Sequence, residues 1–424
     1  MARKKKKNKF INIVFIVLVI VILVWSSNFF IGNNKEAEGQ EDSYEKNIEE
    51  KNPDGNPEEE KEETEEKGEV KTKSIKISAV GDIMFHMSQI KGGYDELTDT
   101  YDFNPFFEEI KPFIEEADIA FGNFEGTTAG LDNGNVYKAW PVFNLPDETL
   151  DAIKNAGFDV LSTINNHSID MGKQGIIRTI QQINKRDMLH IGTRTIPEEK
   201  RVLILEENDI KVAVIAYTYG CNGLEQYLTE DELEYMVNII DENKIKQDIE
   251  YSKEKKADLI IAFMHWGGEY QRDPSVAQRN LADVMLNKGV DIILGSHPHV
   301  IQDSKTLEID NEKKFVAYSM GNFISNQRYE TLAHEYPNIN TYFTEDGVLI
   351  NLEVEKDMET NKTKLKEIEF IPTWVNRTKL NGKYDYDVLP IKHYMENNSV
   401  SEKLEIRMNN SYQNTMDKMN INLN

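Results

Sequence analysis

From residue 74 to about residue 321, short runs of β-branched residues alternate with longer amphipathic stretches. The β-branched runs predict strands at 75–80, 119–121, 160–164, 202–205, 212–217, 259–264, 292–294 and 315–318. The amphipathic stretches predict helices at 105–116, 147–156, 172–186, 247–256 and 276–288. This alternation is typical of an α/β domain. Beyond it, alternating runs at 348–354 and 366–372 predict antiparallel strands, and a short helix is predicted at 401–408.

The first 73 residues have a different character. Residues 1–9 carry six basic side chains, and an apolar run of membrane-spanning length follows at 10–31. This order predicts a basic cytoplasmic stub and a single-pass signal anchor, with the rest of the chain extracytoplasmic. A cleavable signal peptide is the alternative, although its apolar core would be shorter. Residues 32–73 are acidic and almost free of aliphatic residues, which predicts a disordered linker.

The remaining residues divide into a domain at 74–327 and a C-terminal extension at 328–424, which we expect to complete the sheet and end in a polar tail. The chain has 49 basic and 74 acidic side chains, a net charge of −25, which disfavours nucleic acid as a partner. It has one cysteine, Cys221, so neither an internal disulfide nor a thiolate metal cluster can form. Any metal must be held by histidine and oxygen ligands.

Polar side chains collect where the predicted strands end, and these positions hold five of the eight histidines. The side chains concerned are Asp82, His86, Asn123, Glu125, Asn165, Asn166, His167, Asp170, His265, Trp266, Glu269, His297, His299, Ser319 and Asn322. In α/β sheets, ligands bind outside the carboxyl ends of the strands. Imidazole, carboxylate and amide oxygen are donors for Mn, Fe or Zn, so the pattern predicts a divalent-metal site, with two ions as the expectation. If the chain stays extended after 295, His297 and His299 would point to the same face.

Seven segments in this order resemble the CapA family of poly-γ-glutamate capsule synthesis proteins. They are GDIMFH at 81–86, GNFE at 122–125, FNLP at 143–146, NNHSIDMG at 165–172, HWGGEY at 265–270, GSHPH at 295–299 and YSMGNF at 318–323. The domain of that family is similar to the calcineurin-like metallophosphoesterases. The resemblance covers about residues 75–327, and it implies a metallophosphoesterase-like β-sandwich flanked by helices, in α-β-β-α layers.

The resemblance also implies roles for individual residues. The implied metal ligands are Asp82, Asn166, His265, His297 and His299, with His265 and His297 on one ion and His299 on the other, and Glu125 is a further candidate ligand. His167 falls where a general acid protonates or orients the leaving group, and Asp170 is grouped with it as catalytic. The residues expected to contact substrate or support the ligands are His86, Asn123, Asn165, Trp266, Glu269, Ser319 and Asn322.

Two positions depart from the metallophosphoesterase pattern. Met84 stands where that pattern has a histidine, and a thioether cannot replace an imidazole. Asn123 stands near the position of a bridging aspartate, and a neutral amide is a weaker ligand. Either Glu125 supplies the missing charge, or the two-metal centre is incomplete.

The sequence leaves three functions open. The leading hypothesis is a membrane-anchored, extracytoplasmic protein that acts in the synthesis or export of an anionic cell-surface polymer, which the resemblance implies is poly-γ-glutamate, alongside membrane-bound polymer synthase subunits. The first alternative is a metal-dependent phosphoesterase that acts on a phosphate ester of the cell envelope. The second alternative is a polymer-binding scaffold whose metal site is degenerate and does not catalyse a reaction.

Overall fold

The computed structural model describes residues 71–380 and 382–419. The predicted basic stub (1–9), the predicted membrane segment (10–31) and the predicted linker as far as residue 70 lie outside the described residues. Within the described ranges, no helix combines the length and the apolar character needed to cross a bilayer.

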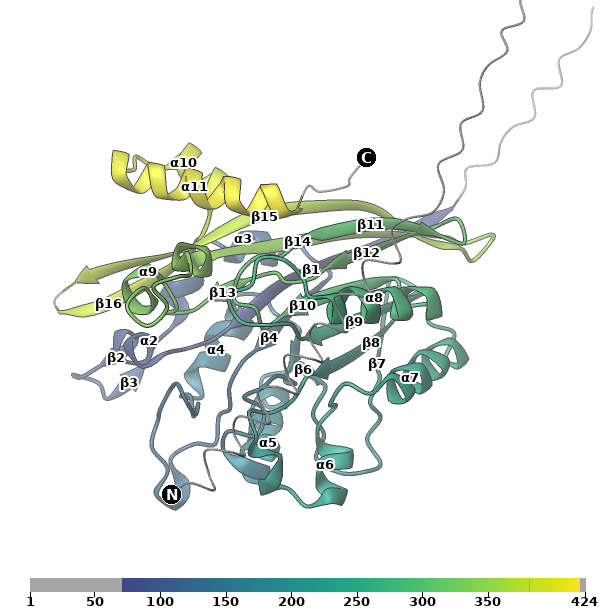
Figure 1. Ribbon diagram of the computed structural model, residues 1–424, viewed down its shortest axis with the longest axis horizontal. Coiled ribbons are helices and arrows are strands. Elements are labelled where there is room, and N and C mark those ends of the chain that lie inside the picture. The colour runs from purple at the N-terminus through teal and green to yellow at the C-terminus, as the bar shows by residue number, and fades with distance from the viewer. Residues whose placement is uncertain (1–70, 381, 420–424) are drawn as a thin grey trace, which may run out of the picture. The chain divides into compact units, whose positions relative to one another are not determined.

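The strands form two large sheets (Figure 1). The first has the order β16-β15-β14-β1-β4-β5-β6, and β13 pairs with β1. Its strands are β1 (Thr72–Ile83), β4 (Ile119–Phe124), β5 (Val160–Ser162), β6 (Leu189–Ile191), β13 (Asn322–Ile324), β14 (Asp346–Asp357), β15 (Thr363–Leu380) and β16 (Lys383–Pro390). Strands β1, β4, β5 and β6 are parallel, whereas β14, β15 and β16 join them as antiparallel neighbours.

The second sheet has the order β11-β12-β10-β9-β8-β7. Its strands are β7 (Leu203–Glu207), β8 (Ile210–Thr218), β9 (Leu259–His265), β10 (Ile292–Ser296), β11 (Ser304–Ile309) and β12 (Glu312–Ala317). The four inner strands, β8, β9, β10 and β12, run parallel. A separate small hairpin pairs β2 (Tyr94–Asp95) with β3 (Thr100–Tyr101).

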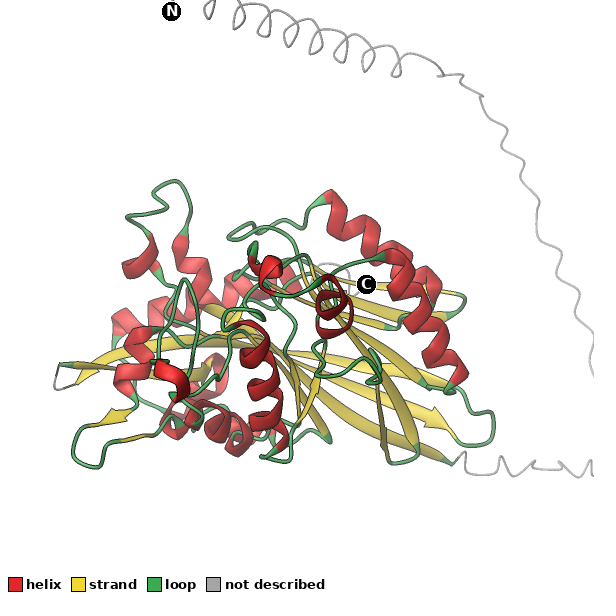
Figure 2. Cartoon of the chain, turned by 90° about the horizontal axis from the view of Figure 1, so that it is seen from below, coloured by secondary structure: helices red, strands yellow, loops and turns green. Residues whose placement is uncertain are grey.

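Helices cover the outer faces of the two sheets. They are α2 (Met87–Gly92), α3 (Lys111–Ile114), α4 (Glu148–Asn155), α5 (Gly172–Asn184), α6 (Glu230–Met236), α7 (Glu242–Glu254), α8 (Val276–Lys288), α9 (Tyr329–Leu332), α10 (Ile391–Asn397) and α11 (Glu402–Met419). Short 3₁₀ turns occur at Asn104–Phe107, Asp132–Gly134, Leu224–Tyr227 and Thr341–Glu345. Figure 2 shows the strands lying between helices.

The period-2 alternation of strand side chains produces the layers. On β8, Val214 packs into a core shared with residues of the first sheet such as Ile77 and Phe121. Its neighbour Ile215 faces the opposite way, into a core that includes Ile249 of α7 and residues of α8. Helices α3 and α4 close the other side of the first sheet through a third core. The predicted mixed α/β fold is confirmed, and its layers follow the order helix, sheet, sheet, helix.

Two predictions of secondary structure were wrong in extent. The helix predicted at 105–116 is broken into the 3₁₀ turn Asn104–Phe107 and the single turn α3, because Pro112 has no amide hydrogen to continue a longer helix. The end of the chain is more ordered than the predicted helix at 401–408, because α11 runs to Met419 and buries Met408, Ser411, Thr415 and Met419. These side chains recur at spacings of three and four residues, but two of them are polar, which hid the periodicity.

A close backbone contact fixes the position at which β1 enters the functional site. A Cβ atom on Gly81 would lie 2.0 Å from the carbonyl oxygen of Gly321. The amide of Asp82 donates a hydrogen bond to this same oxygen, at 3.0 Å. Only glycine permits this approach, so the backbone of Asp82 is held against the segment that leads into β13.

Candidate metal centre

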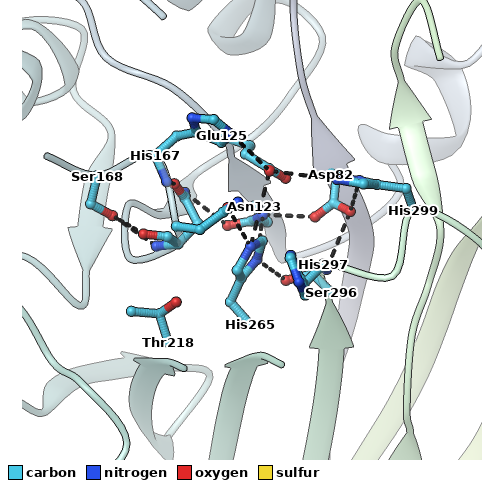
Figure 3. A network of polar contacts seen from close by, with 12 residues as sticks. Asp82, Asn123, Glu125, His167, Ser168, Thr218, His265, Ser296, His297 and His299 are labelled. Carbon is cyan, nitrogen blue, oxygen red and sulfur yellow. Dashed lines mark hydrogen bonds and ion pairs between the residues drawn. The ribbon is translucent and has the colours of Figure 1, made fainter. Parts of the chain in front are cut away.

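The site lies where parallel strands of both sheets end. Asp82 of β1 is in register with Asn123 of β4 and with Asn322 of β13. In the second sheet, His265 of β9 is in register with Ser296 of β10. Figure 3 shows that the side chains from these strand ends and the following loops point toward one another. The sequence pattern correctly predicted this convergence at the carboxyl ends of the strands.

Asp82 lies at the centre of a hydrogen-bond network. Its Oδ1 accepts a bond from Nδ2 of Asn123 at 2.8 Å, and its Oδ2 lies 3.1 Å from Nδ1 of His299 (Figure 3). The amide of His297 also approaches Oδ2, at 3.3 Å. Asn322 supports His299 from the other side, with its Oδ1 3.1 Å from the same Nδ1 atom. Asn123 therefore orients Asp82 through its amide nitrogen, and it does not act as the bridging carboxylate of the metallophosphoesterase pattern.

His265 is positioned by both of its ring nitrogens. Its Nδ1 lies 2.9 Å from the hydroxyl of Ser296, and its Nε2 lies 2.9 Å from Oδ1 of Asn166. Asn165 ties the loop that carries Asn166 to β4, because its Nδ2 donates to the carbonyl of Phe124 at 2.8 Å. The histidine and amide ligands implied by the resemblance are thus held side by side.

Glu125 is buried, and neither of its carboxylate oxygens has a hydrogen-bond partner among the described residues. Three imidazole Nε2 atoms surround Oε1, those of His299 at 3.8 Å and of His167 and His265 at 4.0 Å each. A buried carboxylate without a partner is costly, and it fits a cation that shares ligands with these imidazoles. Glu125, and not Asn123, brings the second carboxylate into the cluster.

The buried His297 also has an unpartnered nitrogen, Nδ1. Its φ of 95° and the φ of 57° at His299 lie in the left-handed region. The expected extended chain after residue 295 was therefore wrong, because the backbone turns at each histidine. The potential ligand atoms form two groups: Asp82, Glu125 and His265, and Glu269, His297 and His299. This differs from the implied pairing of His265 with His297 and gives Glu269 a place among the candidate ligands.

The pKa values of His265 and His297 suit ligation, whereas His299 must lose a proton before it can bind a metal ion. Burial lowers the pKa of His297 to about 3, with help from His299, and burial likewise lowers the pKa of His265 well below its usual range. Both imidazoles are neutral near neutral pH, the form that binds metal. Burial opposes the charged form of His299, but Glu125 and Asp82 outweigh it and raise its pKa to about 9. Burial and then Asp82 raise the pKa of Glu125 well above its usual value.

His167 is held in a fixed orientation at the rim of the cluster. Its Nδ1 bonds to Oδ2 of Asp170 at 2.8 Å, and the same carboxylate oxygen accepts the amide of Phe143 at 2.6 Å. The ring of Phe143 packs edge-to-face against the His167 ring, with the two ring centroids 4.7 Å apart. Nε2 of His167 is therefore left to face Glu125 and the adjoining cleft.

A cleft of about 600 Å³ opens beside the cluster. It is lined by Met84, His86, Trp140, Pro141, Val142, Asn166, His167, Asn222, Leu224, Glu269, Tyr270, His299, Asn326, Gln327, Thr331, Leu332, Glu335 and Tyr336. Among the expected supporting residues, His86 and Glu269 reach this cleft. Met84 forms part of the cleft wall, and it is the residue that stands where the metallophosphoesterase pattern has a histidine.

Two expected contact residues lie elsewhere. Trp266 is buried in the core beneath α7 and α8, and its indole nitrogen donates to the carbonyl of Tyr318, so it packs beside the end of β9 and does not line the cleft. Ser319 is buried, and its hydroxyl accepts the amide of Gly321, which makes it part of a turn. The sequence analysis missed Ser296 and Tyr270. Ser296 stands between Gly295 and His297 of a motif already singled out, so its position was the available signal.

Comparisons with known proteins agree with this geometry. A family model described as "Bacterial capsule synthesis protein PGA_cap" matches residues 76–327. Capsule biosynthesis protein CapA of Bacillus anthracis is 30% identical over 264 residues, which are 61% of this chain and 61% of that protein. PGA biosynthesis protein CapA of Bacillus subtilis (strain 168) is 28% identical over 271 residues, 61% of this chain and 66% of that protein. The chain thus spans 61% and 66% of the lengths of these relatives.

Solved structures with partial similarity include a phosphatase from Mycoplasma pneumoniae and a putative 5′-nucleotidase from Staphylococcus aureus. The phosphatase has a TM-score of 0.41 and 17% sequence identity, and the match covers 71% of this chain and 94% of the phosphatase chain. The nucleotidase has a TM-score of 0.44 and 12% sequence identity, and the match covers 80% of this chain and 58% of the nucleotidase chain.

The unpartnered carboxylate gives a direct test of metal binding. Replacing Glu125→Gln should weaken the binding of Mn²⁺ or Zn²⁺ to the full-length chain by at least about tenfold, because a charged ligand is lost. The variant should remain folded without metal, because glutamine keeps the size and shape of the buried side chain. Isothermal titration calorimetry and thermal unfolding measure the two effects. Glu335→Gln, an exposed carboxylate of the cleft, is the matched control; equal metal affinity in both variants and the unmodified chain would refute the assignment.

Proposed function

The chain belongs to the bacterial capsule synthesis family PGA_cap, and from this premise we propose that it acts in the synthesis or export of an anionic cell-surface polymer, poly-γ-glutamate. The main support for the proposal is that the segment matched by the family model also contains the cluster of candidate ligands. All the candidate ligands, from Asp82 to His299, lie within residues 76–327. The name of the Bacillus subtilis relative, PGA biosynthesis protein CapA, supports poly-γ-glutamate as the polymer.

The residues of the cluster fit divalent metal ions. Asp82, Glu125, Asn166, His265, His297 and His299 would hold them, with Glu269 beside the last two. Such ions would polarise a carbonyl or phosphoryl oxygen of the substrate and lower the pKa of a bound water. The protein's own contribution is to fix the ligands through Asn123, Ser296 and Asn322 and to keep His167 oriented.

The charge of the cleft constrains how a polyanion can bind. Glu269 and Glu335 line the cleft, and no lysine or arginine is among the described residues that line it. The chain as a whole carries a net charge of −25. A polymer rich in carboxylates would therefore be repelled unless metal ions in the cluster supply positive charge.

We expect the full-length chain to bind oligo-γ-glutamate only when it is loaded with metal. Fluorescence anisotropy with a labelled oligomer should show binding to the metal-loaded protein and its loss after treatment with EDTA. Glu335→Gln should strengthen binding because it removes a repulsive charge, whereas Asp82→Asn should weaken it together with metal content. Polymer binding that persists without metal would contradict this mode of recognition.

A second candidate function is the hydrolysis of a phosphate ester of the cell envelope. The observation that favours it is the Asp170–His167 pair, whose geometry leaves Nε2 of His167 free to donate a proton to a leaving alcohol. In this reaction water would form the new bond to phosphorus, the bond from phosphorus to the ester oxygen would break, and His167 would give its proton to that oxygen as the alcohol leaves. Asp170 would stabilise the charged imidazole before that transfer. A proton of the attacking water would then restore the protonated His167.

Hydrolysis of an aryl phosphate by the metal-loaded full-length chain tests this candidate. His167→Asn should lower kcat by about 10²- to 10⁴-fold, the usual contribution of general acid catalysis. Asp170→Asn should cause a smaller loss, and Lys305→Gln, an exposed position on β11, should have no effect. If the metal-loaded protein does not hydrolyse the ester, the phosphoesterase candidate fails, and a polymer-binding scaffold becomes the better description.

We also propose that residues 10–31 anchor the chain in the membrane, with the folded domain extracytoplasmic and close to membrane-bound polymer synthase subunits. The length of the apolar run and the six basic side chains before it support this orientation. Fractionation of cells should place the full-length chain in the membrane, and external protease should digest the domain in intact spheroplasts. A soluble product that lacks residues 1–31 would show instead that the segment is cleaved.

A further inference from the structure

A second cavity lies between the segment 192–202, α6 and α7. Its volume is about 430 Å³, within the range of small-molecule sites. It shares no lining residue with the cleft beside the metal centre. Tyr235 of α6 and Tyr251 of α7 supply aromatic surface, and Arg194, Lys200 and Arg201 supply positive charge. We call it the Arg194 cavity.

Arg194 is 5% exposed, yet its guanidinium forms no ion pair with any residue in the described part of the chain. Its single hydrogen bond within those residues runs from Nη1 to Oδ1 of Asn238, at 2.6 Å. Burial lowers the pKa of Arg194 to about 10, so the group is still charged near neutral pH. Asp248 and Glu199 lie near enough to oppose this fall in pKa, but neither forms an ion pair with Arg194. A buried charge without a close counter-ion is destabilising, and such arrangements are concentrated at functional sites.

The guanidinium is also held rigidly. Asn238 donates from its Nδ2 to the carbonyl of Ala216 on β8, at 3.0 Å, and its amide donates to the carbonyl of Gly192. The amide of Arg194 donates to the carbonyl of Met236. One edge of the guanidinium is therefore fixed against the second sheet, and its remaining nitrogens are available to the cavity. A fixed donor fork loses less conformational entropy when it binds a ligand.

The carboxylates that line the cavity are already engaged. Asp248 pairs with Arg201 at 2.8 Å, and Glu234 pairs with Lys244 at 2.7 Å. Glu199 accepts hydrogen bonds from the backbone amide and the hydroxyl of the residue four positions before it. None of the three lies in an ion pair with Arg194.

Lys200, at the exposed rim of the cavity, likewise has no ion-pair partner among residues 71–380 and 382–419. Among the lining residues, Arg194, Lys200 and Arg201 balance three carboxylates, so the cavity is close to neutral in a chain whose net charge is −25. The two unpaired cations are the groups that remain open to an anion.

We propose that the Arg194 cavity is a second binding site, which takes a small molecule bearing a carboxylate or phosphate group. The planar fork of Arg194 matches the paired oxygens of either group, and Lys200 adds charge at the rim. Tyr235 and Tyr251 contact the rest of the ligand. This site stands independently of the polymer function, because it uses none of the residues of the metal centre.

Isothermal titration of the full-length chain in EDTA tests the site, with inorganic phosphate and free glutamate as the two probes. We expect one of them to bind, and its identity to distinguish a phosphate ligand from a carboxylate ligand. Arg194→Gln should weaken binding by about tenfold or more, as expected for the loss of a charge-assisted hydrogen bond. Lys200→Gln should weaken binding by a smaller factor, and Lys305→Gln, which removes an equal charge from β11, should leave it unchanged.

Thermal unfolding of each variant shows whether it is folded. If Arg194→Gln does not fold, the exposed Lys200→Gln variant decides the question. Unchanged probe affinity in the folded variants overturns the proposal, as does the absence of binding of both probes at millimolar concentration. Equal weakening by Lys305→Gln would also overturn it, because the effect would then come from net charge and not from the cavity.

Discussion

Glu125 places a buried carboxylate, which has no hydrogen-bond partner in the described part of the chain, where three imidazole nitrogens approach to within 4.0 Å. Charge in such a place is costly, and the surrounding structure must prevent the side chains from moving apart or drawing in water. The two sheets meet this requirement by ending their parallel strands at one edge. Strands position Asp82 and His265, and hydrogen bonds from neighbouring strands and loops orient them.

The backbone at this edge of the sheets also helps to hold the cluster together. Left-handed conformations at His297 and His299 are uncommon for residues other than glycine, and they turn each imidazole individually. The close approach of Gly81 to Gly321 sets the position of Asp82. Strained or crowded backbone persists only when its surroundings determine it, and it is concentrated at functional sites. The buried cores on both faces of the two sheets provide that rigidity.

Electrostatics separate the two cavities. The cleft beside the cluster has carboxylates and no lysine or arginine among its described lining residues, so bound metal ions would supply most of its positive charge. The Arg194 cavity obtains its positive charge from the chain itself, with a guanidinium anchored to Asn238. In a protein with a net charge of −25, we therefore expect anions to bind in the metal-loaded cleft and in the Arg194 cavity.

The sequence by itself determined the alternation of strands and helices and most of the metal-centre residues, because β-branched runs and motifs at strand ends are local signals. It did not reveal that Pro112 divides a predicted helix, nor that Ser411 and Thr415 give α11 a buried face. Only the tertiary structure decided that Trp266 lies in the core, that Glu269 groups with His297 and His299, and that Arg194 is buried with no ion pair among the residues described. The physical reason is that burial, ligand grouping and charge compensation depend on which distant segments the two sheets bring together, and spacing along the chain does not contain that information.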